Sequence, residues 1–155
     1  MSLRESRQTF QTNIDCTVSG VAERGGILSY VPGVVGLCEY ANAAAVSGQL
    51  SNPAGLLLDD VEALNYYNHP EYRQRNVVPQ GSVVGIATEG EFLTDMVETA
   101  TADGASVGTY APGDTLYLAD GGNVSRQQIA ALRPVVGKCL AAITADGFLK
   151  IRVEL

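Results

Sequence analysis

Turn-forming residues divide this chain into short apolar segments, and this division restricts the fold more than any other feature. The 155 residues include 17 glycines and 6 prolines. Glycine accepts the positive φ angles of tight turns, and proline fixes φ near the value that many turns need. Apolar runs of about four to eight residues between such turns are typical of β-strands. The sequence therefore predicts a mainly β fold.

The C-terminal third carries this pattern most clearly. In residues 148–155, apolar residues alternate with Lys150, Arg152 and Glu154, as expected for a half-buried strand. The dipeptide Asp146-Gly147 precedes it and is typical of a hairpin turn. Residues 134–143 and 148–155 are therefore predicted to form a terminal hairpin. Asp103-Gly104 and Asp120-Gly121 are predicted to be turns of the same kind.

Other segments extend the β prediction towards the N-terminus. Residues 41–50 and 125–132 are exceptions that suit short helical turns, the second with Ser125 as its N-cap. We therefore expect a small β-barrel or β-sandwich with short helical turns and an extended N-terminal arm. The remaining predicted strands are residues 27–31, 34–40, 56–61, 77–86, 91–97 and 115–118.

A Val-Val-Gly phrase occurs three times, starting at Val34, Val83 and Val135. β-branched residues favour strands, and a glycine inside a strand marks a bulge or a close backbone approach. We therefore expect all three phrases to be core strands whose glycines permit curvature.

The length suits one domain, preceded by a polar segment. Residues 1–13 contain the single aromatic residue Phe10 and show no sustained apolar period. Two alternatives remain open for this segment, a disordered terminus or an arm that orders against a neighbour. The predicted organisation is an arm at 1–13 and one β-rich domain at 14–155.

Charge and cysteine content restrict the partners and the compartment. The net charge is −7 and only two residues are lysines, so the chain lacks the basic cluster that neutralises phosphates, and we expect no nucleic-acid partner. No apolar run approaches the ~20 residues that span a membrane, and no signal-peptide layout is present. Three widely spaced cysteines, Cys16, Cys38 and Cys139, are expected to be free and buried in a reducing compartment.

Residues that could carry chemistry do not form a recognisable motif. His69 is the single histidine, so no usual zinc spacing can be written, and no serine lies in a Gly-x-Ser-x-Gly elbow. Asp114, Asp120 and Asp146 are explained by turns, although calcium held by such carboxylates from different loops stays an alternative. We therefore expect no catalytic residue, no metal, no cofactor and no enzymatic activity; an enzyme would have to use His69.

A polar and aromatic excursion at residues 62–76 is the best candidate for a partner interface. Tyrosine and arginine often anchor interfaces because they combine large apolar area with hydrogen-bonding groups. The alternatives are a loop folded back onto its own barrel, or a tyrosine platform for a sugar or nucleobase. The predicted interface residues are Phe10, Tyr66, Tyr67, His69, Tyr72, Arg73 and Arg75.

Turn-and-strand motifs follow one another in a fixed order over residues 55–155. The earlier ones lie in residues 55–61, 80–85 and 89–92, and the later ones in residues 112–118, 121–122, 133–138 and 146–147 with the closing strand. This order resembles that of small tailed-bacteriophage capsid decoration, or cement, proteins.

This resemblance implies a β-rich protein on the outside of an icosahedral head, where it would clamp neighbouring major capsid subunits. It implies self-association, with a trimer favoured and a dimer possible, and contact of the N-terminal arm with the shell. The implied location is the virion exterior, after assembly in the bacterial host cytoplasm. Alternatives are another virion component, such as a tail, baseplate or head-fibre module, or a β-barrel that binds a carbohydrate or small ligand.

Overall fold

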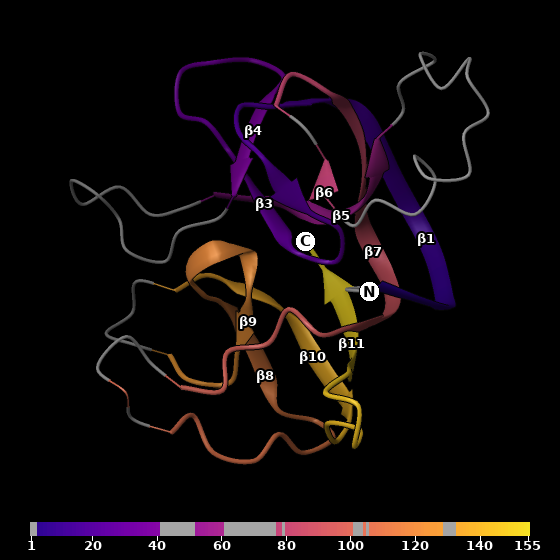
Figure 1. The fold of residues 1–155 in the computed structure, drawn as a ribbon, viewed down its shortest axis with the longest axis vertical. Helices are drawn as coiled ribbons and strands as arrows, with labels where there is room; N and C mark the ends of the chain where they lie inside the picture. Colours follow the sequence, from indigo (N-terminus) through magenta and orange to yellow (C-terminus); the bar gives the residue numbers. More distant parts are fainter. Residues whose placement is uncertain are drawn as a thin grey trace.

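A computed structural model gives the architecture of the chain (Figure 1). It describes residues 3–40, 52–60, 77–78, 80–100, 104, 106–128 and 133–155, with the backbone alone at residues 3–12, 59 and 60. The described residues are mainly β, which confirms the predicted fold class. The one helical element among them is the short 3-10 helix η1 (Asp120–Gly122).

The strands follow one another along the chain with few regular interruptions. They are β1 (Leu3–Val18), β2 (Ala22–Glu23), β3 (Ile27–Tyr30), β4 (Leu37–Tyr40), β5 (Asn52–Asp60), β6 (Val77–Val78), β7 (Val83–Thr94), β8 (Thr115–Leu118), β9 (Val124–Ser125), β10 (Val135–Ala141) and β11 (Leu149–Glu154).

Five of these strands close into a barrel. Their order is β1-β4-β3-β5-β7, and β7 pairs again with β1, so the sheet returns to its first strand. Closure leaves no free edge in this part of the sheet, which protects it from edge-to-edge association. The predicted alternatives of barrel and sandwich are thereby resolved in favour of a barrel.

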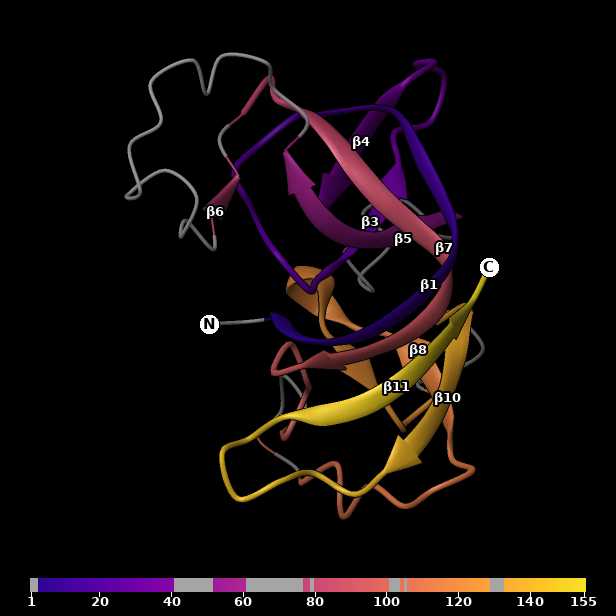
Figure 2. The same ribbon diagram turned by 90° about the vertical axis from the view of Figure 1, so that its right-hand side faces the viewer.

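A second lobe lies beside the barrel and shares its long strands. β7 continues past the barrel and pairs with β11, and the sheet then runs β11-β10-β8-β9. Beyond β7 the chain returns to the far edge, where the Glu98 amide donates to the Val124 carbonyl (2.9 Å) and the Val124 amide to the Met96 carbonyl (3.0 Å). Figure 2 shows β1 and β7 running from one lobe into the other.

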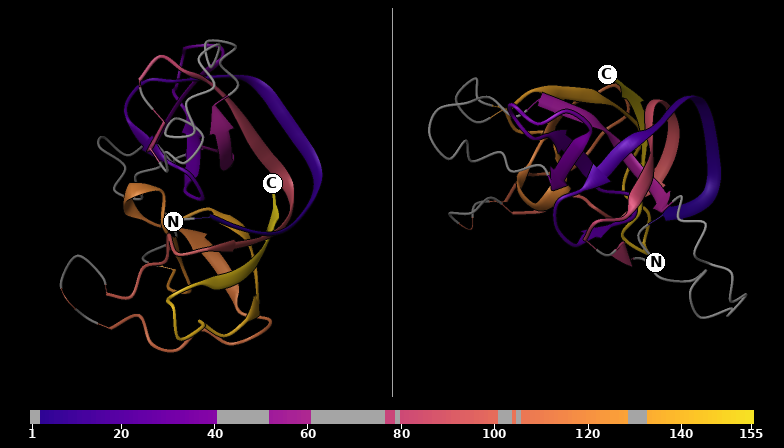
Figure 3. Two further views of the ribbon diagram at one scale, coloured as in Figure 1. Left: turned by 45° about the vertical axis from the view of Figure 1, so that its right-hand side comes forward. Right: turned by 90° about the horizontal axis from the view of Figure 1, so that it is seen from above.

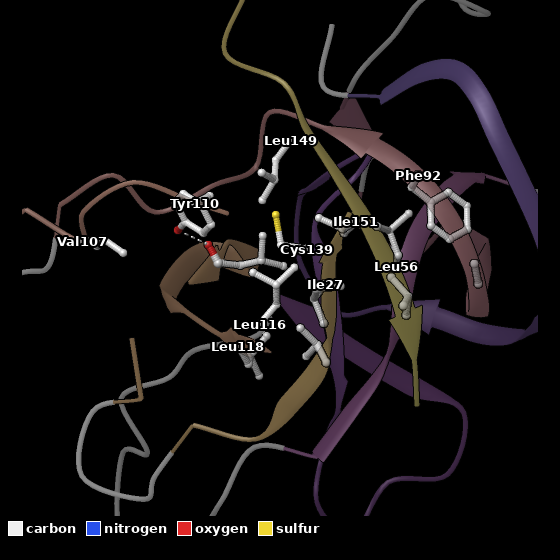
Figure 4. Packing of buried hydrophobic residues seen from close by; sticks show 14 residues of the cluster. Ile27, Leu56, Phe92, Val107, Tyr110, Leu116, Leu118, Cys139, Leu149 and Ile151 are labelled. Carbon is white, nitrogen blue, oxygen red and sulfur yellow. Dashed lines mark hydrogen bonds between the residues drawn. The ribbon is translucent and has the colours of Figure 1, made fainter. Parts of the chain in front are cut away.

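β3 and β5 are buried on both faces, and this explains their continuous apolar runs. Side chains alternate between two faces along a strand. Leu28 and Leu57 point into the barrel, whereas their neighbours Ile27 and Leu56 join the core of the second lobe. That second core is shown in Figure 4, and its other labelled members are Phe92, Val107, Tyr110, Leu116, Leu118, Cys139, Leu149 and Ile151.

Tyr40 joins the two lobes. Its hydroxyl accepts a hydrogen bond from the Glu23 amide, and burial raises its pKa to about 12. A Cβ atom on Gly122 of η1 would lie 2.6 Å from two ring carbons of Tyr40, and Gly122 has a φ of +75°. Only glycine both adopts this positive φ angle readily and has no Cβ atom to clash with the Tyr40 ring. The dipeptide Gly121-Gly122 therefore lets η1 pack closely against the barrel.

The terminal hairpin agrees with its prediction. β10 and β11 pair antiparallel, and the Gly147 amide donates to the Thr144 carbonyl (2.9 Å) in the intervening turn. The predicted turn at Asp120-Gly121 lies in η1, which connects the antiparallel strands β8 and β9. Gly104 has a φ of +77°, as its predicted turn requires, while Asp103 lies outside the described residues.

Several predicted boundaries differ from the structure. The strands predicted at 77–86 and 91–97 are replaced by β6 and one continuous strand β7, because Ala87, Glu89 and Gly90 pair on both sides and extend the ladder. Ser125 lies in β9 rather than at a helix N-cap, because it pairs with Tyr117 of β8. The helical turn predicted at 41–50 falls outside the described residues, as does the end of that predicted at 125–132.

The segment predicted to be an N-terminal arm forms the first part of β1. This strand runs without a break through residue 13, and its Cα partners on β7 extend from Leu3 opposite Thr94 to Thr17 opposite Val83. Backbone hydrogen bonding makes this pairing available even to a polar segment.

All three cysteines are free and buried, as predicted. Cys16 and Cys38 belong to the interior of the barrel, on the neighbouring strands β1 and β4, and Cys139 belongs to the core of the second lobe. The Cys139 thiol donates to the Ala141 carbonyl (3.1 Å), and burial raises its pKa.

Candidate interaction surface

The turn between β3 and β4 presents two valines to solvent. Val35 is fully exposed and Val34 is 49% exposed. Gly33 and Gly36 on either side have φ angles of +79° and +74°, so the chain turns sharply both before and after the valines. The first Val-Val-Gly phrase is therefore not a core strand. The prediction was wrong because these two turns leave no length for a strand.

This turn is fixed against the C-terminal end of β1. The Gly36 carbonyl accepts a hydrogen bond from the Thr17 amide (2.8 Å), and the position of a Cβ on Gly36 would lie 3.2 Å from the Asp15 carbonyl oxygen. Ile14, the residue before Asp15, is 57% exposed. A further apolar side chain thus lies in the segment of β1 that borders the turn.

The outer surface of the barrel carries further apolar side chains on the neighbouring strands β4 and β7. Thr17 of β1 lies between Val83 of β7 and Leu37 of β4, and Cα partners in a sheet direct their side chains to the same face. Val83 is exposed and Leu37 is half-buried, whereas the alternate residues of these strands point into the barrel. We call the resulting surface the apolar barrel face, composed of Ile14, Val34, Val35, Leu37 and Val83.

Acidic residues adjoin this face. Asp15 of β1 and Glu39 of β4 are both exposed and follow Ile14 and Leu37 within two positions of the chain. An apolar centre with a polar rim is the usual composition of a protein interface. Exposed apolar side chains that adjoin one another mark interaction sites more reliably than scattered single residues do. The arrangement suits contact with a partner whose surface is apolar at the centre and basic at the margin.

Of the interface residues predicted from sequence, Phe10 is the one that the structure describes, by its backbone alone. Phe10 lies in β1, where it is the extra residue between Thr9, opposite Gly90, and Gln11, opposite Glu89. Such an extra residue is a β-bulge. The other predicted residues, Tyr66, Tyr67, His69, Tyr72, Arg73 and Arg75, lie outside the described residues, so their role in an interface stays a prediction.

The residues of the apolar barrel face were missed because valine and isoleucine favour buried strands. A signal was nevertheless present in the sequence Pro32-Gly33-Val34-Val35-Gly36. Turn residues on both sides of an apolar pair indicate an exposed tip rather than a strand.

A buried ion pair is the second notable cluster, and it lies in the second lobe. Arg133 and Glu98 are 5% and 10% exposed, and two hydrogen bonds of 2.6 and 2.9 Å join them in a bidentate arrangement. Arg133 also donates to the Gln127 carbonyl (3.3 Å). Burial alone would raise the pKa of Glu98, but hydrogen bonds from Arg133 and Ser125 outweigh that effect and lower it.

Tyr110 completes this network from the other side. Its hydroxyl donates to the backbone carbonyl of Glu98 (2.6 Å), and burial raises its pKa to about 12. Perturbed titratable groups sometimes mark active sites, but here each charged group is satisfied by the other and by the backbone. The network therefore holds the segment that follows β7 against the segment that leads into β10.

Two findings, on metal-ligating groups and on membrane-spanning helices, concern the part of the chain that the structure describes. None of its groups of three or more histidine, cysteine, aspartate or glutamate residues could hold a metal ion. It also contains no helix long and apolar enough to cross a membrane. Comparison of the sequence with known protein families and with curated proteins finds no match.

Proposed function

We propose that this chain is a structural virion protein that binds the outer surface of a tailed-bacteriophage head and cements neighbouring major capsid subunits. The observation that carries the proposal is the apolar barrel face, an apolar surface with an acidic margin displayed by a closed barrel. A rigid barrel loses little conformational entropy when it docks, so most of the contact energy contributes to binding. The partner would be the major capsid protein, and the location the virion exterior after assembly in the host cytoplasm.

The energetics suit a protein that acts in many copies. Full burial of one valine side chain stabilises a contact by about 1.5–3 kcal/mol. The few side chains of the apolar barrel face would therefore give each copy only a moderate affinity. Repetition over an icosahedral shell compensates for this, because each bound copy stabilises the assembled state by mass action. Stabilisation of this kind needs shape and contact area but no catalytic residue.

Two further features agree with the proposal. The motifs that resemble decoration proteins make up β5, β7 and the strands of the second lobe, so they fold into one continuous sheet. β7 pairs with β1 and β5 in the barrel and with β11 in the second lobe, so one continuous strand connects the two lobes. A protein that clamps two capsid subunits needs this kind of mechanical continuity.

The proposal predicts specific binding to empty, expanded heads of the cognate phage. The wild-type protein should sediment with these heads and raise their resistance to chaotrope. Val34→Ser with Val35→Ser should weaken binding about tenfold or more, since loss of ~1.4 kcal/mol corresponds to a factor of ten. The measurement is a sedimentation binding isotherm.

Val135→Ser is the matched control for this experiment. Val135 belongs to the second lobe and is 52% exposed, close to the 49% of Val34. The Val135→Ser substitution should leave binding to heads and the melting temperature of the protein unchanged. Wild-type protein that fails to bind heads, or equal weakening by both sets of substitutions, would contradict the proposal. Binding to tails, baseplates or a glycan instead would assign the protein to one of the alternative classes.

A further inference from the structure

A single irregular pairing holds residues 3–13 of β1 to the rest of the described structure. These residues, which we call the arm segment, pair with β7 on one side and have no second strand among the described residues. The register shifts between Arg4 and Gln8, between Thr9 and Gln11, and between Gln11 and Thr12. A strand pairing that is interrupted this often fixes its register only weakly, and strands with a weakly fixed register are prone to pair with alternative partners.

The arm segment ends at an irregularity within β1, where the strand enters the closed part of the barrel. The register shifts again between Asn13 and Cys16, and the Asp15 amide donates to the Asn13 side-chain oxygen (2.8 Å). This is an Asx-turn, a local bend that needs no tertiary contact. Beyond it, Cys16 and Val18 are buried inside the barrel. The change from barrel strand to arm segment therefore occurs within three residues.

The arm segment occupies one side of β7. Both views of Figure 3 show the curved part of β1 along the outer side of β7. On its other side β7 pairs with β11 from Glu89 to Thr94. Removal of the arm segment would therefore leave one open edge of β7, and an open edge is a template for another strand.

We propose that the arm segment pairs with β7 of a second copy of this chain, so that copies associate by exchanging arms. An identical chain offers the same β7 edge, so every backbone hydrogen bond formed within one chain can form between two chains. Exchange of an identical element is a low-cost route to a closed oligomer. The inference rests on the strand pairing alone and is independent of binding to a capsid.

The direct test places one cysteine on each side of the pairing, in separate chains. Gln8 and Glu91 are Cα partners, and directly opposed residues lie within the ~4.4–6.8 Å that a disulfide can bridge. Chains with Gln8→Cys and chains with Glu91→Cys are mixed unfolded, refolded together under reducing conditions and then oxidised. We expect a covalent heterodimer on a non-reducing gel. The native cysteines are buried in the folded protein and should not react.

A control chain carries Glu91→Cys together with Arg152→Cys, a Cα pair between β7 and β11 that exchange of the arm leaves intact. It should cross-link only within itself and migrate as a monomer. A chain with both Gln8→Cys and Glu91→Cys that also cross-links only within itself, with no heterodimer in the mixture, would overturn the proposal. If neither the mixture nor the chain with both Gln8→Cys and Glu91→Cys formed a cross-link, the proposal would also be overturned, because the arm segment would then not pair with β7 at all.

Discussion

Replacement of Gly137 by alanine should destabilise the protein by about 3 kcal/mol or more, because the added methyl group has no space. A Cβ at this position would lie 1.8 Å from the Arg152 carbonyl oxygen and 3.1 Å from the Cα atom of Val153. Both atoms are backbone, so relief requires β10 and β11 to separate. Overpacking of a core costs ~1–3 kcal/mol when side chains can adjust, and a clash between backbones should reach or exceed that range.

The effect should appear as a fall in melting temperature of about 6–12 °C, since 1 kcal/mol corresponds to ~2–4 °C for a chain of this size. Gly20→Ala is the matched control, because a Cβ there would meet no atom within 4 Å. It should leave the melting temperature nearly unchanged. If both substitutions were equally harmless, the close approach of β10 to β11 would be refuted.

Substitution of Glu98 by glutamine should destabilise the protein by about 3–5 kcal/mol, the usual result of breaking a buried ion pair. The loss is large because Arg133 would keep its charge in a site that is 5% exposed, without its partner. Urea denaturation at neutral pH measures this change. Replacement of both Glu98 and Arg133 by methionine should cost clearly less, because no charge then remains unpaired.

The same pair should make stability depend on pH. The pKa of Glu98 is lower in the folded protein than in the unfolded chain. The ion pair therefore contributes its full share of the free energy of unfolding above the unfolded-state pKa of about 4.3, and loses it as the pH falls through the folded-state pKa. The difference between wild type and Glu98→Gln should therefore shrink below about pH 4. Arg152→Gln is the control, because the Arg152–Glu154 pair (2.8 Å) is solvent-exposed and should contribute less than ~1 kcal/mol. If the difference in stability between wild type and Glu98→Gln persisted unchanged at low pH, this result would argue against the Glu98–Arg133 ion pair.

The parts of the fold that local pattern determines could be predicted. Alternation in residues 148–155 and the turn at Asp146-Gly147 gave the terminal hairpin because both signals are encoded within a few residues. The continuous apolar run Leu56-Leu57-Leu58 is explained only by burial of β5 on both faces, which requires knowledge of the second lobe.

Features that depend on distant residues could not be predicted. The barrel closes through the pairing of β1 with β7. The first residues of β1 are too polar to show the apolar alternation of a strand, so their pairing with β7 decides their conformation. Glu98 and Arg133 are 35 residues apart and share no motif. The exposed tip at Val34 and Val35 was misread because its β-branched residues favour strands, while the positive φ angles of Gly33 and Gly36 impose turns.

The central claim is that the apolar barrel face binds the outside of a capsid, and an electron cryomicroscopy reconstruction of decorated heads tests it most directly. Empty heads of the cognate phage would be imaged with and without the purified protein. The account predicts added density on the outer surface of the shell, with the turn that carries Val34 and Val35 against the major capsid protein. Heads without added density, or density in which the second lobe faces the shell and the turn faces solvent, would contradict it.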